Sequence, residues 1–154
     1  MVRRMVKQRI LITLISSENA RKGYKFLFEG MLMNECKTCS LSRICIGNLE
    51  KGRVYEVINV RGKKHRCKAF NIDLVVVEVK EAEIEAAIHT SLAMEGAIIT
   101  FKPVNCSNIS CNYYELCNPV GLKNGDKCKI IRIFKKLECP RKLPLTKVLI
   151  SRYL

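Results

Sequence analysis

Cysteines recur at a fixed distance along this chain of 154 residues. Three cysteines of the first half reappear in the second half at a constant offset of 72, so that Cys39, Cys45 and Cys67 correspond to Cys111, Cys117 and Cys139. The flanking segments also align, with residues 19–28 (NARKGYKFLF) matching 92–101 (LAMEGAIITF) at an offset of 73. A fixed period of this kind indicates a tandem duplication, in which each repeat folds as a similar unit.

Each repeat has one more cysteine in front of these three. The complete patterns are C-x2-C-x5-C-x21-C from Cys36 and C-x4-C-x5-C-x21-C from Cys106. Thiolates are soft ligands, and four of them can hold either tetrahedral Zn²⁺ or an iron–sulfur cluster. We therefore predict two metal sites, one formed by Cys36, Cys39, Cys45 and Cys67 and the other by Cys106, Cys111, Cys117 and Cys139.

The spacing within each set favours a cluster over a zinc ion. Structural zinc sites usually combine two C-x2-4-C pairs, and neither repeat has a second pair. A [4Fe-4S] cubane takes one cysteine on each of four iron atoms, which suits ligands that are spread apart. We predict two [4Fe-4S] clusters as cofactors, with two Zn²⁺ ions as the alternative and disulfides or free buried thiols as a third possibility.

Alternating apolar residues predict four short strands in each repeat. The predicted strands are 10–15, 24–30, 53–60 and 73–79 in the first repeat, and 84–88, 97–101, 127–133 and 146–151 in the second. We expect a polar loop around the fourth cysteine and a helical turn at 40–45 and 112–117. The ninth cysteine, Cys128, aligns with Tyr55 on a predicted strand, where it should behave as a small core residue.

The fold class that follows is mainly β, with α+β possible. We predict a tandem duplication of two small four-stranded halves, each with a four-cysteine site, packed as one domain. The acidic join near residue 80 has no Pro, Gly or Ser linker, which favours packing of the halves. The expected divisions are a basic N-terminal extension (1–9), a first repeat (10–80) and a second repeat (81–154).

Positive charge dominates the composition. Lys and Arg outnumber Asp and Glu by 28 to 14, a formal charge of +14 that exceeds what solubility needs and suggests an anionic partner. Basic residues gather beside both fourth cysteines: Arg61, Lys63, Lys64, Arg66, Lys68, Lys135, Lys136, Arg141 and Lys142. They either compensate about −2 of charge at each site, or contact the phosphates of a nucleic acid. Nucleic acid and an acidic protein are the predicted partners, and the oligomeric state stays open.

The sequence also narrows the compartment and the function classes. No apolar run approaches the roughly 18 residues of a membrane span, and ILITLI after MVRRMVKQ lacks the length and cleavage site of a secretory signal. We expect a soluble cytoplasmic protein, in which dense cysteines bind metal. No G-x-G-x-x-G loop, Walker loop or nucleophile elbow is present, so enzymatic activity stays undecided.

From about Ile10 to Leu154 the chain resembles Uncharacterised Protein Family 0179 of archaea. The motifs that carry the resemblance are CKTCSLSRIC, CSNISCNYYELC, KKHRCKAF, LECPRKLP and the turn AMEG. It implies two cysteine clusters suspected of being iron–sulfur redox centres, without an established activity. The chain departs from the family pattern in its longer basic start and in Cys128. We expect a redox or electron-relay role, with a metal-stabilised module for binding nucleic acid or a nucleoprotein as the alternative.

Overall fold

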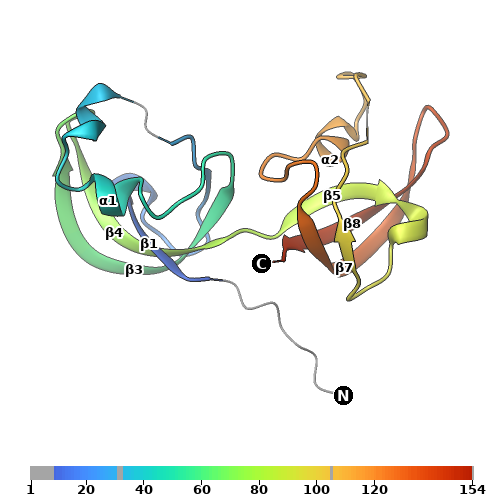
Figure 1. Ribbon diagram of the computed structural model, residues 1–154, viewed down its shortest axis with the longest axis horizontal. Coiled ribbons are helices and arrows are strands. Elements are labelled where there is room, and N and C mark those ends of the chain that lie inside the picture. Colours follow the sequence, from blue (N-terminus) through green and yellow to red (C-terminus); the bar gives the residue numbers. More distant parts are fainter. Residues whose placement is uncertain (1–8, 31–32, 105, 154) are drawn as a thin grey trace, which may run out of the picture. The chain divides into compact units, whose positions relative to one another are not determined.

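The chain forms two compact units that divide between Ala82 and Glu83 (Figure 1). The structure is a computed structural model that describes residues 9–30, 33–104 and 106–153. Residues 1–8 of the predicted basic extension lie outside this range. Each unit contains one four-stranded antiparallel sheet, which confirms the predicted mainly β fold of two four-stranded halves. The exact repeat bounds and the packing of the halves on each other stay predictions.

The two sheets have the same strand order. The first has the order β1-β4-β3-β2, and its strands are β1 (Leu11–Ser16), β2 (Lys25–Leu27), β3 (Val54–Cys67) and β4 (Ile72–Glu81). The second has the order β5-β8-β7-β6, and its strands are β5 (Ile84–His89), β6 (Ile98–Thr100), β7 (Lys127–Glu138) and β8 (Pro144–Arg152). Among the described residues, no helix is long and apolar enough to cross a membrane.

The helices are short and lie in the connections. In the described part of the chain the α-helices are the single turns α1 (Ser42–Cys45) and α2 (Tyr114–Cys117), within the segments where helical turns are predicted. The same residues contain three 3-10 helices, at Ser17–Asn19, Asn34–Lys37 and Thr90–Leu92. Each sheet therefore has to hold its cysteine segment with very little regular structure inside that segment.

Equivalent turns in the two units make equivalent hydrogen bonds. The Gly23 amide donates to the Val57 carbonyl at 2.8 Å, and the Gly96 amide donates to the Ile130 carbonyl at 2.8 Å. The two donors, and likewise the two acceptors, are related by the offset of 73 that the aligned flanking segments have. A common origin of the halves stays a prediction, which this correspondence supports.

Each sheet buries apolar side chains on both faces, because neighbouring residues of a strand point to opposite sides. In β4, Val75, Val77 and Val79 belong to the main core of the first unit, whereas Leu74 and Val76 belong to a smaller cluster. In the second unit, Val148 and Ile150 belong to the main core and Leu145 to the smaller cluster. The smaller cluster of each unit includes cysteines of its four-cysteine set.

The predicted polar loop around each fourth cysteine is shorter than expected. β3 extends to Cys67 and β7 extends to Glu138, so most of each basic segment is strand, and Cys139 lies in the turn that follows β7. Pairing with β4 and β8 satisfies their backbone groups while the charged side chains reach solvent. Both hairpins have register shifts at corresponding places, between Val60 and Lys64 and between Ile133 and Lys135. Such bulges bend a strand, so that the part after the bulge leaves the core.

Replacing the turn glycines tests whether the two halves share the same positive-φ turn conformation. Gly23 and Gly96 have φ of +87° and +84°, and nothing lies within 4 Å of a Cβ added at either position. Gly23→Ala and Gly96→Ala should therefore each lower the free energy of unfolding by about 1–2 kcal/mol through backbone strain alone. Chemical denaturation followed by circular dichroism measures the loss. Asn tolerates positive φ better, so Gly96→Asn should cost less than Gly96→Ala; equal costs would contradict this explanation.

Candidate metal centres

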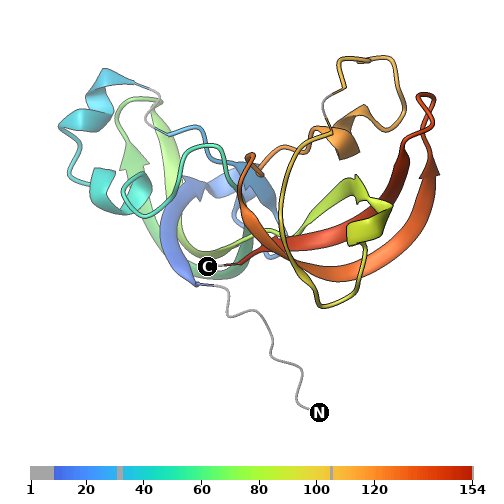
Figure 2. The same ribbon diagram turned by 45° about the vertical axis from the view of Figure 1, so that its right-hand side comes forward.

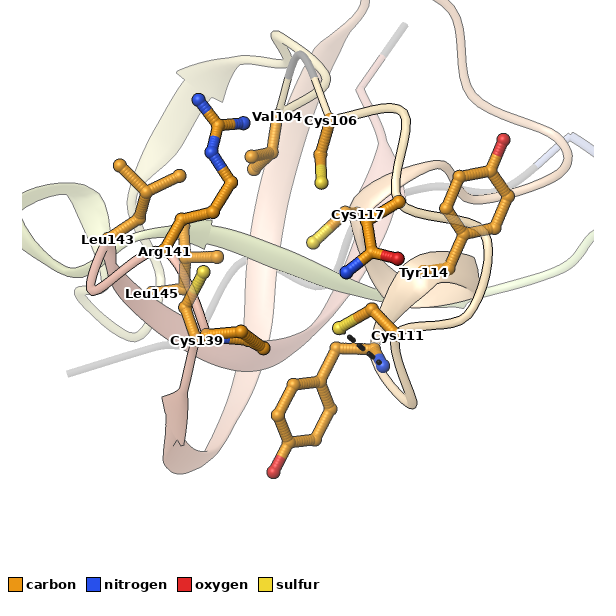
Figure 3. Close-up of a pocket in the computed structure, with 12 residues that line it drawn as sticks. Val104, Cys106, Cys111, Tyr114, Cys117, Cys139, Arg141, Leu143 and Leu145 are labelled. Carbon is orange, nitrogen blue, oxygen red and sulfur yellow. Dashed lines mark hydrogen bonds between the residues drawn. The ribbon is translucent and has the colours of Figure 1, made fainter.

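In the second unit, all four cysteines of the predicted set line one cavity (Figure 3). The four are Cys106, Cys111, Cys117 and Cys139. They come from the long connection between β6 and β7 and from the β7–β8 turn. Apolar side chains, including Val104, Leu143 and Leu145, form other parts of the lining. The fold thus gathers thiols that lie far apart in the chain.

A helical turn orients the middle of this set. The Tyr113 carbonyl accepts a hydrogen bond from the Cys117 amide at 3.0 Å, and α2 ends at that cysteine. Cys117 is only 5% exposed and packs with Ala87 and Leu145 of the sheet. The Tyr113 amide donates to Cys111 Sγ at 3.5 Å (Figure 3). One short turn therefore buries one thiol and supplies a hydrogen-bond donor to another.

The hairpin turn places the fourth thiol. The Lys142 amide donates to the Cys139 carbonyl at 2.8 Å, and Lys142 has a φ of +58°. Pro140 follows Cys139, and its ring fixes φ near the value that the second residue of a β-turn requires. Cys139 therefore stands directly at the end of β7, on the wall of the cavity.

The thiols of this set differ in their electrostatic surroundings. Burial raises the pKa of Cys117, and the nearby Cys106, Cys111 and Cys139 raise it further. The pKa of Cys106 is lowered, chiefly by a hydrogen bond from the Asn108 backbone and also, against the effect of burial, by the Arg141 guanidinium. The site thus combines a buried thiol with a positively charged side chain, and the thiols are close enough to influence one another.

The first unit builds its set on matching elements. Cys36 lies in the 3-10 helix Asn34–Lys37, Cys39 follows it, Cys45 ends α1 and Cys67 ends β3. Burial raises the pKa of Cys45 to about 11, with further contributions from its three partners, Cys67 first. The fold therefore brings these four thiols into one neighbourhood too.

Two side-chain hydrogen bonds fasten this segment to the sheet. The Thr13 hydroxyl donates to the Cys45 carbonyl at 3.0 Å, and the Asn48 amide group donates to the Ile12 carbonyl at 2.9 Å. Thr13 is 1% exposed. Neither residue stands out in the sequence, because each bond joins positions that are far apart in the chain.

The assignment of metal ligands itself stays a prediction. Within the described ranges, no three His, Cys, Asp or Glu side chains form a group that could hold a metal ion. None of the nine cysteines, all of which lie in the described residues, forms a disulfide. Cys128 belongs to neither set, since it is fully buried in the main core beside Ile130 and Phe101. That position agrees with the core role expected from its strand.

All nine basic residues of the predicted nucleic-acid contacts lie on the two long hairpins. Arg61, Lys63, Lys64 and Arg66 are on β3, Lys135 and Lys136 are on β7, and Lys68, Arg141 and Lys142 are in the turns. Two of them pair with acids of β4. Arg61 Nη2 lies 2.7 Å from Glu78 Oε1, and Arg66 Nη1 lies 2.8 Å from Asp73 Oδ1. Their role toward nucleic acid stays a prediction.

Comparison with known proteins gives one consistent result. The sequence model of "Uncharacterised protein family (UPF0179)" matches residues 11–150. A UPF0179 protein of Methanocaldococcus jannaschii is 39% identical over 141 residues, which are 91% of this chain and 93% of the relative. UPF0179 proteins of Methanosarcina barkeri and Pyrococcus abyssi are 41% and 40% identical, each over 91% of this chain and over 95% and 97% of their own lengths. No solved structure matches.

The Arg61–Glu78 pair gives the first unit an acid-sensitive contact. Hydrogen bonds from Arg61 and Asn59 hold the pKa of Glu78 below its ordinary value of 4.5. A carboxyl group whose pKa is lower in the folded than in the unfolded chain stabilises the fold at pH values above its ordinary pKa. This stabilisation is lost as the pH falls through the lowered pKa. Glu78→Gln should therefore lose less unfolding free energy than the wild type on acidification below about pH 4.5. Urea denaturation over this range measures the difference.

The exposed Glu95, which lies in the other unit, provides the matched control. Glu95→Gln should leave the wild-type pH dependence in place, because the ion pair of the first unit is intact. If Glu78→Gln and the wild type lose stability in parallel, the Arg61–Glu78 pair does not stabilise the fold.

Proposed function

The chain belongs to the Uncharacterised protein family UPF0179, whose name assigns no activity, and we propose that it is a redox protein that holds two [4Fe-4S] clusters and relays electrons. In this proposal Cys36, Cys39, Cys45 and Cys67 hold one cluster, and Cys106, Cys111, Cys117 and Cys139 hold the other. When bound, a [4Fe-4S] cluster supplies one-electron reduction and reoxidation at a potential set by its surroundings.

The observation that carries the proposal is the cavity lined by four thiols in the second unit. Thiolates are the ligands that iron–sulfur clusters use, and a cluster needs four of them. In the first unit Cys45 ends α1 and Cys67 ends β3, much as Cys117 ends α2 and Cys139 follows β7. The donor chemistry of both sets therefore fits the proposed cofactor.

The spacing of the cysteines supports a cluster over zinc. Structural zinc sites usually combine two C-x2-4-C pairs, and neither set has a second pair. Thiols that are spread along the wall of one cavity suit a cofactor whose four iron atoms lie at separate corners.

The protein's own groups are suited to an anionic site. Four thiolates around a [4Fe-4S]²⁺ core leave a charge of about −2, and Arg141 lies beside Cys106 to oppose it. Donors to sulfur, such as the Tyr113 amide at Cys111, are the kind of contact that tunes a cluster's potential. The burial of Cys117 and the apolar wall at Leu145 limit access of water.

The proposal extends to a partner and a compartment. A chain with a formal charge of +14 would attract an electron-transfer partner with an acidic surface, because complementary charge steers association. Free thiols that await iron need a reducing environment, which supports the cytoplasm.

Removing one buried thiol should remove one cluster. Anaerobically purified wild-type protein should be brown and contain about eight iron and eight sulfide per chain. Cys117→Ala should reduce both contents by about half, since a [4Fe-4S] cluster with three protein ligands is held less well. Iron and sulfide analysis, together with absorbance near 400 nm, measures the loss.

Cys128→Ala is the matched control, because it removes an equally buried thiol that lies in the main core. It should keep the wild-type iron content. A colourless wild-type protein with two zinc ions would contradict the cluster, and iron loss from both variants alike would contradict the proposed grouping.

Loss of the clusters should also destabilise the fold. The cysteine segments contain only single helical turns, so in this proposal the metal supplies much of what holds them. Stripping iron with a chelator and an oxidant should lower the melting temperature, by roughly 5 °C or more if about 1 kcal/mol is lost. Differential scanning calorimetry of the loaded and stripped protein measures the shift. An unchanged melting temperature would contradict this dependence.

A second function, the binding of nucleic acid, is favoured by the charge that the clusters leave uncompensated. Two sites of about −2 each would reduce the formal charge only from +14 to about +10. Sequence-independent binding to phosphates follows from such an excess and weakens steeply with salt. Wild-type protein that binds neither RNA nor DNA at about 50 mM salt would remove this function.

A further inference from the structure

The two long hairpins share a backbone pattern but differ in charge. Residues 54–81, which contain β3 and β4, have six Lys and Arg against four Asp and Glu, a net charge of +2. Residues 127–152, which contain β7 and β8, have nine Lys and Arg against one Glu, a net charge of +8. The excess positive charge of the hairpins is therefore concentrated in the second unit.

Ion pairs between β3 and β4 oppose part of the positive charge of the first hairpin. Three ion pairs join β3 to β4. Glu56 with Lys80 and Arg66 with Asp73 are also paired in register, whereas Arg61 contacts Glu78, whose register partner is Asn59. The longest of these N–O distances is 3.7 Å. Three of the six cations on this hairpin are thus opposed by an acid of the hairpin itself.

The equivalent positions of β8 hold no acid. Glu78 pairs in register with Asn59, and the residue that corresponds to Asn59 in the second repeat is Arg132, which pairs with Leu149. At the other corresponding pairs, the position of Asp73 is held by Pro144, and that of Lys80 by Ser151. No acidic side chain of the described residues forms an ion pair with the exposed Lys135 or Lys136. The side chains of Lys135 and Lys136 on β7 are therefore exposed to solvent without an opposing acid in the described ranges.

One lysine of β7 lies directly opposite a lysine of β8. Lys135 of β7 pairs in register with Lys147 of β8, and like charges in this position are unfavourable. Lys147 also lies 3.3 Å from Glu85 on β5, which compensates one of the two charges. An anion bound beside the two lysine side chains would reduce the remaining repulsion between them.

An aromatic ring lies among the same cations. Phe134 is 37% exposed, and its ring centroid is 5.2 Å from Arg132 Cζ and 5.2 Å from Lys147 Nζ. All five residues from Arg132 to Lys136 are exposed, at the bulge of β7. Figure 2 shows β7 (orange) and β8 (red) as paired, curved strands along which these residues lie. We name Arg132, Phe134, Lys135, Lys136 and Lys147 the basic hairpin patch.

We propose that the basic hairpin patch binds single-stranded nucleic acid. The lysines contact phosphates, and a base stacks on the Arg132–Phe134 pair, since cations combined with an exposed aromatic ring are the usual means of binding unpaired strands. In a duplex the bases are stacked on one another and cannot reach such a ring. The inference rests on the proposed nucleic-acid binding and narrows it to one hairpin and one class of ligand.

The test compares the two hairpins in the full chain with its metal sites intact. Fluorescence anisotropy measures binding of a labelled single-stranded oligonucleotide of about 15 nucleotides at several salt concentrations. The double variant Lys135→Gln/Lys136→Gln should bind more weakly and reduce the log–log salt slope by roughly 1.4, if both lysines contact phosphates. The matched control, Lys63→Gln/Lys64→Gln, replaces the corresponding lysines of β3. It should bind like the wild type, because the cation–π contacts of the described hairpin residues lie in the second hairpin and not beside these lysines.

The ring is tested separately. Phe134→Ala should weaken binding on the order of tenfold with an unchanged salt slope, because stacking contributes without counterion release. Phe134→Tyr keeps the ring and should restore most of the affinity. Circular dichroism and iron content should match the wild type in each variant, which separates binding from folding.

Four outcomes would overturn the inference. Equal losses from the two lysine pairs would show that the charge acts without a defined site, and equal affinity for a duplex would exclude single-strand recognition. Equal affinity for an acidic polypeptide such as polyglutamate would assign the patch to a protein partner. Absence of wild-type binding at about 50 mM salt would remove the underlying nucleic-acid function as well.

Discussion

The pairing register of one long hairpin in each unit determines where nearly everything else lies. Because alternate residues of a strand face opposite sides, the register decides at once which side chains enter the main core and which support the cysteine segment. In β8, Val148 packs in the main core, whereas Leu145 packs beside Cys117. A slip of one residue would exchange these faces, and it would also move Cys139, at the end of β7, relative to its partners.

The bulges let one strand serve two purposes. Before its bulge, β3 contributes Tyr55 and Val57 to the main core; after it, the strand is mostly exposed and ends at Cys67. β7 follows the same plan, with Ile130 in the core and an exposed basic stretch that ends beside Cys139. Core and cysteine site are thus joined by a continuous hydrogen-bonded ribbon, which gives the fourth thiol a firmer position than a loop would.

The two units share the same arrangement of strands but differ in the side chains around their cysteines and on their hairpins. Thr13 fastens the cysteine segment of the first unit, while in the second unit Arg141 lies beside Cys106. In the first hairpin acids oppose three of the six cations, and in the second the corresponding positions of β8 hold no acid. The proposed functions divide in a similar way, since both units have the thiols for a cluster and the second combines exposed cations with an aromatic ring.

Local patterns in the sequence were enough to predict several features. Cysteine spacing predicted two sets of four, of which the second lines one cavity, and alternation predicted four strands in each half and a core position for Cys128. The extension of β3 through charged residues could not be predicted, because strand pairing overrode a polar composition that is typical of loops. The basic stretches of β3 and β7 look alike in the sequence. Their difference in ion pairing appears only once the sheets are formed, because register between segments distant in the chain sets the cross-strand partners. It places Glu78 opposite Asn59 and within reach of Arg61, but Leu149 opposite Arg132.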